Sequence, residues 1–176
     1  RRLSGKNRHY FGTQKEEKGA EMQDYYIGLE NGRMLGYRFY GDPKGVPVFY
    51  VHGGGGSRIF AAALHKAALE AGVNLIAADR PGMGISDYQA DRSILDWADD
   101  MAALADHLML DGFSVLSESG GSPFALATAY ALPDRVPKVA LVSASSPTDA
   151  PGVIEAMQPT GRSLIKMMKI FPNFLL

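Results

Sequence analysis

The chain has 176 residues and a mass of 19.0 kDa, which suits one domain of ordinary size. Hydrophobic residues make up 46% and charged residues 21%, so the chain can bury a core and is not disordered throughout. The formal net charge of −1 argues against a nucleic-acid partner, and the lack of cysteine excludes disulfides, thiolate metal sites and a cysteine nucleophile. No segment resembles a membrane span or a signal peptide, and the missing cysteines favour the cytoplasm.

The predicted elements begin after residues 1–23, which show no secondary-structure period and are expected to form a flexible leader. From Asp24, two β-prone runs are joined by Asn31-Gly32, the strongest short hairpin signal. Apolar strands then alternate with helices. The predicted order is strand 46–51, helix 59–71, strand 73–78, a helix opened by Ser93, strand 113–117, helix 120–132 and strand 138–143. This alternation predicts an α/β sheet that is parallel after its opening hairpin.

The most informative segment follows the strand at 113–117, where Ser117-Glu118-Ser119-Gly120-Gly121 leads directly into a helix. A nucleophile elbow needs small residues two positions from its serine, because the strained turn brings backbones together. The turn presents the hydroxyl at the carboxyl edge of the sheet, and the next helix points free N–H groups at developing negative charge. Ser119 is therefore the candidate nucleophile, although Ser117 stands where the pattern has its first glycine.

A second glycine loop, His-Gly-Gly-Gly-Gly-Ser at residues 52–57, follows an earlier strand. Acyl transfer needs two N–H donors for the oxyanion, and one is expected from Gly120 and the other from this loop. A phosphate or dinucleotide loop is the competing interpretation. It fails on spacing, because Arg58 stands where the last glycine belongs and no Gly-Lys-Ser/Thr is present.

Three motifs in this order resemble the N-terminal half of α/β-hydrolase-fold enzymes: HGGGGSR, DRPGMGIS and SESGGSPFALATAYALPDRV. The resemblance spans residues 24–147 and implies that fold, with the sheet apparently truncated after its sixth strand. It assigns the nucleophile role to Ser119 and the oxyanion roles to Gly54 and Gly120. A serine at the elbow argues against haloalkane dehalogenases and epoxide hydrolases, which are similar in the other two motifs.

The resemblance implies that residues 24–149 form the N-terminal part of the core and that residues 150–176 begin a cap. The implied function is hydrolysis of an ester or similar small acyl substrate through a serine nucleophile, with no metal and no cofactor. Cofactor-free peroxidase or carbon–carbon bond hydrolase chemistry on the same fold stays open. A non-catalytic binding domain that keeps the elbow without a triad is the alternative from another class.

Family order places the catalytic acid and histidine after the elbow. All four histidines of this chain precede Ser119: His9, His52, His65 and His107. The triad partners are therefore expected beyond residue 176, and the 176 residues alone are expected to be inactive. We expect His52 to order the oxyanion loop and the other histidines to be structural or exposed.

Three acidic residues near these motifs have structural interpretations. Asp149 fits a turn better than a catalytic acid, although some family variants place the acid there. Glu118 is expected to pack or hydrogen-bond beside the elbow rather than act as a substitute base. Asp79 and Arg80 are expected to form an ion pair that fixes their loop.

Overall fold

The computed structural model describes residues 23–148 and 150–170. The expected leader lies outside the described residues except for its last position, and so do His9 and Asp149. Within the described part of the chain, no helix is both long and apolar enough to cross a bilayer.

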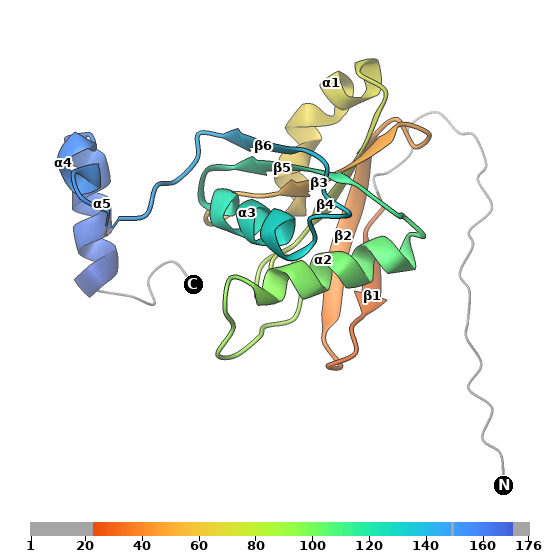
Figure 1. The fold of residues 1–176 in the computed structure, drawn as a ribbon, viewed down its shortest axis with the longest axis horizontal. Coiled ribbons are helices and arrows are strands. Elements are labelled where there is room, and N and C mark those ends of the chain that lie inside the picture. The colour runs from red at the N-terminus through yellow and green to blue at the C-terminus, as the bar shows by residue number, and fades with distance from the viewer. Residues whose placement is uncertain (1–22, 149, 171–176) are drawn as a thin grey trace, which may run out of the picture.

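Six strands form one sheet in the order β1-β2-β4-β3-β5-β6 (Figure 1). β1 pairs antiparallel with β2 and β2 with β4, whereas the other three pairs are parallel. The strands span Tyr25–Gly28 (β1), Met34–Gly41 (β2), Val46–Val51 (β3), Val73–Ala78 (β4), Ser114–Glu118 (β5) and Val139–Val142 (β6). The predicted α/β sheet, mostly parallel and opened by an antiparallel hairpin, is confirmed.

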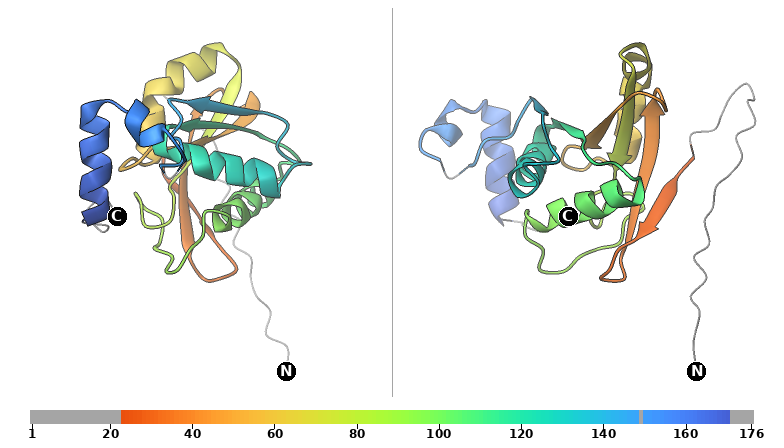
Figure 2. Two further views of the ribbon diagram at one scale, coloured as in Figure 1. Left: turned by 60° about the vertical axis from the view of Figure 1, so that its left-hand side comes forward. Right: turned by 45° about the vertical axis from the view of Figure 1, so that its right-hand side comes forward.

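Helices lie on both faces of this sheet (Figures 1 and 2). They span Arg58–Leu64 (η1, a 3-10 helix), His65–Glu70 (α1), Asp96–His107 (α2), Ser119–Gly121 (η2, a 3-10 turn), Ser122–Ala131 (α3), Val153–Ala156 (α4) and Pro159–Ile170 (α5). α2 and α3 pack together on one face, and α1 lies on the other. α4 and α5 stand away from the sheet, beyond β6 (Figure 1).

The main core lies between the sheet and the α2–α3 layer. Trp97, Met101 and Leu104 recur on one face of α2 and are fully buried, as their helical spacing predicts. The rings of Phe49 and Phe113 stack with centroids 4.2 Å apart. Burial of such side chains contributes about 1.5–3 kcal/mol each, so this layer supplies much of the stability that holds the strand ends in place.

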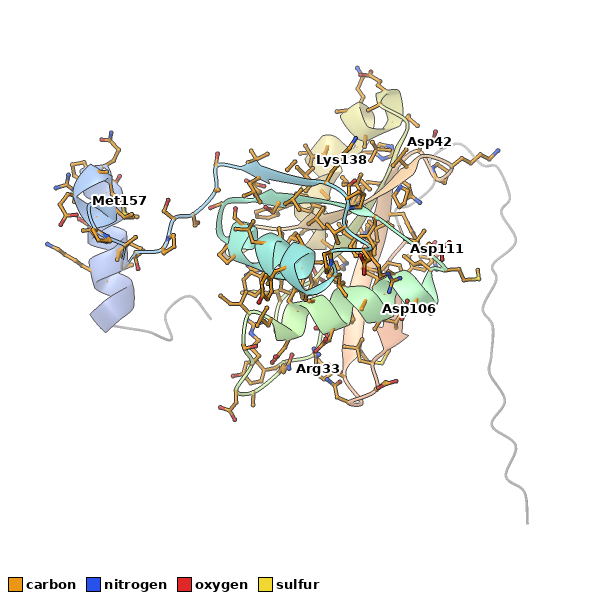
Figure 3. All side chains as sticks on the ribbon, in the orientation of Figure 1. Arg33, Asp42, Asp106, Asp111, Lys138 and Met157 are labelled. Atoms are coloured by element: carbon orange, nitrogen blue, oxygen red, sulfur yellow. The ribbon has the colours of Figure 1, made fainter. Side chains whose placement is uncertain are left out.

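The hairpin forms where Asn31-Gly32 predicts it. Gly32 has φ of 82°, which glycine adopts without steric cost, and its N–H donates to the Leu29 carbonyl at 2.9 Å. Just beyond this turn, Arg33 forms an ion pair with Asp100 of α2. Figure 3 labels Arg33 at this end of the hairpin. The pair ties the hairpin to the helical layer.

Two predicted helices begin later than expected. Residues 58–64 form a 3-10 helix before the α-helix starts at His65. The backbone N–H of Arg58 is held by Asp79, so tertiary contacts rather than alanine content shape these first turns. The other helix starts at Asp96, although Ser93 and Asp96 do exchange the expected hydrogen bonds. Ile94 precedes that helix and stays 47% exposed.

An apolar hollow of about 690 Å³ lies on the α1 face of the sheet. Its lining comes from the end of η1, from α1 and from β3 to β6, including Leu64, Leu75, Leu116 and Ala140. Neither Ser119 nor the glycine loop lines it. The hollow is therefore separate from the candidate site described next.

Candidate active site

The predicted elbow is a sharp turn between β5 and α3. Ser119 has φ of 48°, which places a non-glycine residue in the left-handed region at a cost of about 1–2 kcal/mol. Its side chain is exposed, whereas the neighbouring serines, Ser117 and Ser122, are 0% and 1% exposed. The strained turn thus presents one of these three hydroxyls to solvent.

Close packing behind the turn explains the small residues around Ser119. A Cβ added to Gly121 would lie 2.4 Å from the Val51 carbonyl oxygen, which no side chain tolerates. Ser117 is fully buried, and its hydroxyl has no hydrogen-bond partner among the described residues. The Ser122 hydroxyl donates to the Ser119 carbonyl at 2.8 Å and braces the first turn of α3.

The register of the parallel strands brings the glycine loop to this turn. Val51 pairs with Ser117, so the residues that follow β3 and β5 leave the sheet side by side. A Cβ built on Gly53 would lie 3.3 Å from Ser119 Cβ, and one built on Gly120 would lie 3.1 Å from the Gly54 nitrogen. The structure therefore brings together Ser119, Gly54 and Gly120, the three residues to which the sequence assigns catalytic and oxyanion roles.

His52 is fully buried, and both of its ring nitrogens contact the backbone. Nε2 accepts a hydrogen bond from the Arg80 N–H at 3.1 Å, so Nδ1 carries the proton and donates to the Gly53 carbonyl at 3.0 Å. Burial lowers the pKa of His52 to about 4, and the ring is neutral at pH 7. Because neither nitrogen is free to take a proton from Ser119, the ring orders the glycine loop, as expected.

The depressed pKa of His52 predicts an acid-sensitive fold. Between about pH 6.5 and pH 4 the unfolded chain binds a proton on His52 that the folded chain does not. As the pH is lowered through this window, the free energy of unfolding should therefore decrease by about 3 kcal/mol on account of His52. Urea titrations of the whole protein at several pH values measure it. His52→Asn keeps one donor and one acceptor and should lose this part of the slope; an identical slope in both proteins would contradict the prediction.

The prediction that Asp79 and Arg80 form an ion pair is wrong. Asp79 is fully buried and pairs with Arg58, whose Nη1 lies 2.7 Å from Asp79 Oδ2. The Asp79 carboxylate also accepts hydrogen bonds from the backbone N–H groups of Arg58 and Ile85. Neighbouring side chains at the end of a strand point to opposite sides, so Asp79 and Arg80 face different surroundings. Asp24 holds the other side of the Arg58 guanidinium.

This buried carboxylate also explains a glycine of the DRPGMGIS motif. Gly84 has φ of 52°, and a Cβ there would lie 2.0 Å from Asp79 Oδ2. The Asp79 carbonyl accepts a hydrogen bond from the Ser86 hydroxyl, which in turn accepts one from the Gly36 N–H. These contacts fold the loop after β4 tightly back onto β2.

Arg80 contacts the glycine loop and does not pair with Asp79. Its Nη2 donates to the Gly53 carbonyl at 2.9 Å, and its guanidinium carbon lies 4.6 Å from the centre of the Phe124 ring. Burial lowers the pKa of Arg80 to about 10, and the nearby charge of Arg92 acts in the same direction. Sequence reasoning missed this contact, because only the pairing of β3 with β4 places Arg80 beside Gly53.

Glu118 hydrogen-bonds beside the elbow, as expected. The Tyr50 hydroxyl donates to Glu118 Oε2 at 2.8 Å. Tyr50 belongs to the core cluster on the α1 face, so Glu118 is directed to that face of the sheet. Burial, followed by this hydrogen bond to the carboxylate, raises the pKa of the Tyr50 hydroxyl.

The other described histidines are engaged elsewhere. His65 Nδ1 accepts a hydrogen bond from the Gly41 N–H at 3.0 Å, at the end of β2. The His107 ring packs edge-on against Tyr37, with centroids 6.4 Å apart. Across residues 23–148 and 150–170, no group of three or more histidine or carboxylate side chains is placed to hold a metal ion.

The alpha/beta hydrolase fold family matches residues 46–175, which is most of the chain. The chain belongs to the α/β-hydrolase-fold family. The mostly parallel sheet of this chain carries the turn at Ser119 on its carboxyl edge.

One sequence relative and two solved structures of similar fold illustrate what this chain is similar to. The uncharacterized hydrolase YcgS of Bacillus subtilis (strain 168) is 31% identical over 114 residues, which are 65% of this chain and 39% of that protein. The epoxide hydrolase CorEH is similar in structure, with a TM-score of 0.69 and 22% identity over 84% of this chain and 50% of its own. The N-acyl homoserine lactonase AidH has a TM-score of 0.61 and 19% identity over 70% and 45%.

These comparisons also set the scale of the described chain. The chain of 176 residues matches 39% of the length of YcgS, 50% of CorEH and 45% of AidH. The two solved structures share the fold of this chain, but one is named an epoxide hydrolase and the other a lactonase. The fold alone therefore does not determine the reaction, which depends on the residues of the site.

Proposed function

We propose that this chain carries the nucleophile and the oxyanion hole of a serine hydrolase that acts on an ester or similar small acyl substrate. One observation carries the proposal: an exposed serine in a left-handed turn between β5 and α3, with the Gly54 nitrogen and Gly120 packed beside it. Ser119 Oγ attacks the substrate carbonyl. The Gly54 and Gly120 N–H groups then donate to the oxyanion that forms.

The base that activates Ser119 is proposed to lie elsewhere in the whole protein. Among the described histidines, His52 has both ring nitrogens bonded to the backbone, and His65 and His107 contact Gly41 and Tyr37 of β2. A serine hydroxyl without a base is a poor nucleophile at neutral pH. A histidine and a carboxylate downstream of the elbow complete the triad in this proposal.

The segment after β6 is proposed to begin a cap over the site. β5 and β6 are parallel, so both leave the sheet at the edge where Ser119 lies. α4 and α5 follow β6 and stand clear of the sheet (Figure 1), and Figure 3 labels Met157 there, between the two helices. A covering segment at this edge would enclose the acyl group and set substrate choice.

The test is covalent labelling of the whole protein with a fluorophosphonate, which reacts with activated serines. Mass spectrometry of the labelled peptide should place the adduct on Ser119. Ser117→Ala is the matched control and should label like the wild type, because the Ser117 hydroxyl is buried. An adduct on Ser117 or Ser122, or no adduct at all, would overturn the proposal.

A side chain at Gly54 should weaken the oxyanion hole without disturbing the fold. A Cβ at Gly54 would have no neighbour within 4 Å, so Gly54→Val should leave the thermal midpoint nearly unchanged. In the proposed site the added methyl groups displace the substrate oxygen, and kcat should fall by at least about tenfold. Gly28→Val in β1 is the control, because its Cβ meets only Met34 at 3.9 Å. Full turnover in Gly54→Val would show that the loop is only a connector.

A further inference from the structure

The peptide unit between Gly53 and Gly54 is held by three donors, one of which is the Gly56 N–H of the same loop, 3.2 Å from the Gly53 carbonyl oxygen. The other two are side chains. The carbonyl oxygen accepts one hydrogen bond from Arg80 Nη2 at 2.9 Å and one from His52 Nδ1 at 3.0 Å. The backbone N–H of Arg80 in turn donates to His52 Nε2 at 3.1 Å. Arg80 therefore acts on this peptide directly through its guanidinium and indirectly through the histidine ring.

The carbonyl and the N–H of a trans peptide point in opposite directions in one plane. The described peptides are all trans, so fixing the Gly53 carbonyl also fixes the direction of the Gly54 N–H. Hydrogen bonds to a carbonyl polarise the amide and make its N–H a stronger donor. A hydrogen bond from a charged guanidinium is stronger than one from a neutral donor, so the bond from Arg80 is expected to polarise this peptide most.

We propose that Arg80 is a positioning residue for the hydrolysis, which aims and polarises the Gly54 N–H by binding the Gly53 carbonyl. This inference rests on the proposed function, since it assigns Arg80 to the oxyanion hole of that same site. Arg80 does not touch the substrate. It acts through the one peptide that carries the donor.

The surroundings of Arg80 suit this role. The residue is 5% exposed, and across residues 23–148 and 150–170 it forms no ion pair. A buried cation without a carboxylate is costly, and a carboxylate partner would cancel its field at the carbonyl. Stacking on Phe124, at 4.6 Å from the ring centre, keeps the guanidinium plane in place. Phe124 lies on α3, the helix that begins at the elbow, so the same helix adjoins the turn at Ser119 and contacts Arg80.

Arg92 provides a matched control within the same cluster. Its guanidinium carbon lies 5.9 Å from the Phe124 ring, and its Nη1 donates to the Pro81 carbonyl at 2.9 Å. Arg92→Gln thus removes a nearby positive charge without touching the Gly53 carbonyl. Arg80→Gln removes the charge and the bond together, and Arg80→Lys retains the charge.

The experiment compares these variants in the whole protein with a p-nitrophenyl ester and a trifluoromethyl ketone, which forms a tetrahedral oxyanion on an activated serine. Arg80→Gln should lower kcat by about 10–100-fold, with KM changed less than about threefold. The affinity for the ketone should fall by a similar factor. Arg80→Lys should recover part of the loss, and Arg92→Gln should stay within about threefold of the wild type.

The outcomes that would overturn the inference are separate from those that would overturn the proposed function. If Ser119 takes the fluorophosphonate but Arg80→Gln and Arg92→Gln have equal kcat, Arg80 has no positioning role and the proposed function stands. If Ser119 takes no label in the wild type, both fail. Should Arg80→Gln not fold, Arg80→Lys decides the matter: an unchanged kcat together with unchanged ketone affinity would count against the inference, and a loss of both would support it.

Discussion

Ser119→Ala should abolish hydrolysis of an activated ester by the whole protein, with a loss in kcat on the order of 10⁴–10⁶-fold. The substitution removes the attacking oxygen and leaves only the oxyanion donors and binding. The thermal midpoint should barely move, because the Ser119 side chain is exposed and alanine at this φ is no more strained than serine. Steady-state kinetics and a thermal melt on the same preparations measure both effects.

The two neighbouring serines are the controls for this result. Ser122→Ala loses a buried hydrogen bond to the Ser119 carbonyl, so it should cost about 1 kcal/mol of stability while keeping most of the turnover. Ser117→Ala removes a buried hydroxyl that has no partner among the described residues, and both stability and turnover should hold. Wild-type turnover in Ser119→Ala would rule out a serine nucleophile at this turn.

Asp79→Ala should destabilise the protein by about 3–5 kcal/mol, the largest stability effect that we expect from one substitution here. Asp79 is fully buried, pairs with Arg58 and accepts the backbone N–H groups of Arg58 and Ile85. Alanine leaves those two donors and part of the Arg58 charge without a partner. Urea unfolding monitored by circular dichroism gives the free energy.

Asp106→Ala is the matched control for this carboxylate. Asp106 pairs with Arg135 at 2.7 Å, but its side chain is 70% exposed on α2 (Figure 3). Removing an exposed ion pair costs about 1 kcal/mol or less. If Asp79→Ala and Asp106→Ala were equally mild, the buried network around Arg58 would not be stabilising.

Local signals in the chain were sufficient for the hairpin, the strand–helix alternation and the turn at Ser119. Asn31-Gly32 adopts its turn because Gly32 has φ of 82° at no cost, whatever lies around it. The small residues around Ser119 predict the elbow because the strained turn needs them within five consecutive residues. Such patterns consist of a few consecutive residues, so they can be recognised from the sequence. The contact that excludes a side chain at Gly121, by contrast, comes from the Val51 carbonyl on a distant strand.

Contacts between distant segments were decided by the tertiary structure alone. The pairing of β3 with β4 puts Arg80 on the Gly53 carbonyl and Asp79 on Arg58, whereas the sequence suggested that the two neighbours bind each other. The register of Val51 with Ser117 brings Gly54 to Gly120. Strand order is set by the packing of whole elements, and charged side chains then bind whichever partner the fold delivers. The spacing of residues along the chain does not show which distant side chains will pair.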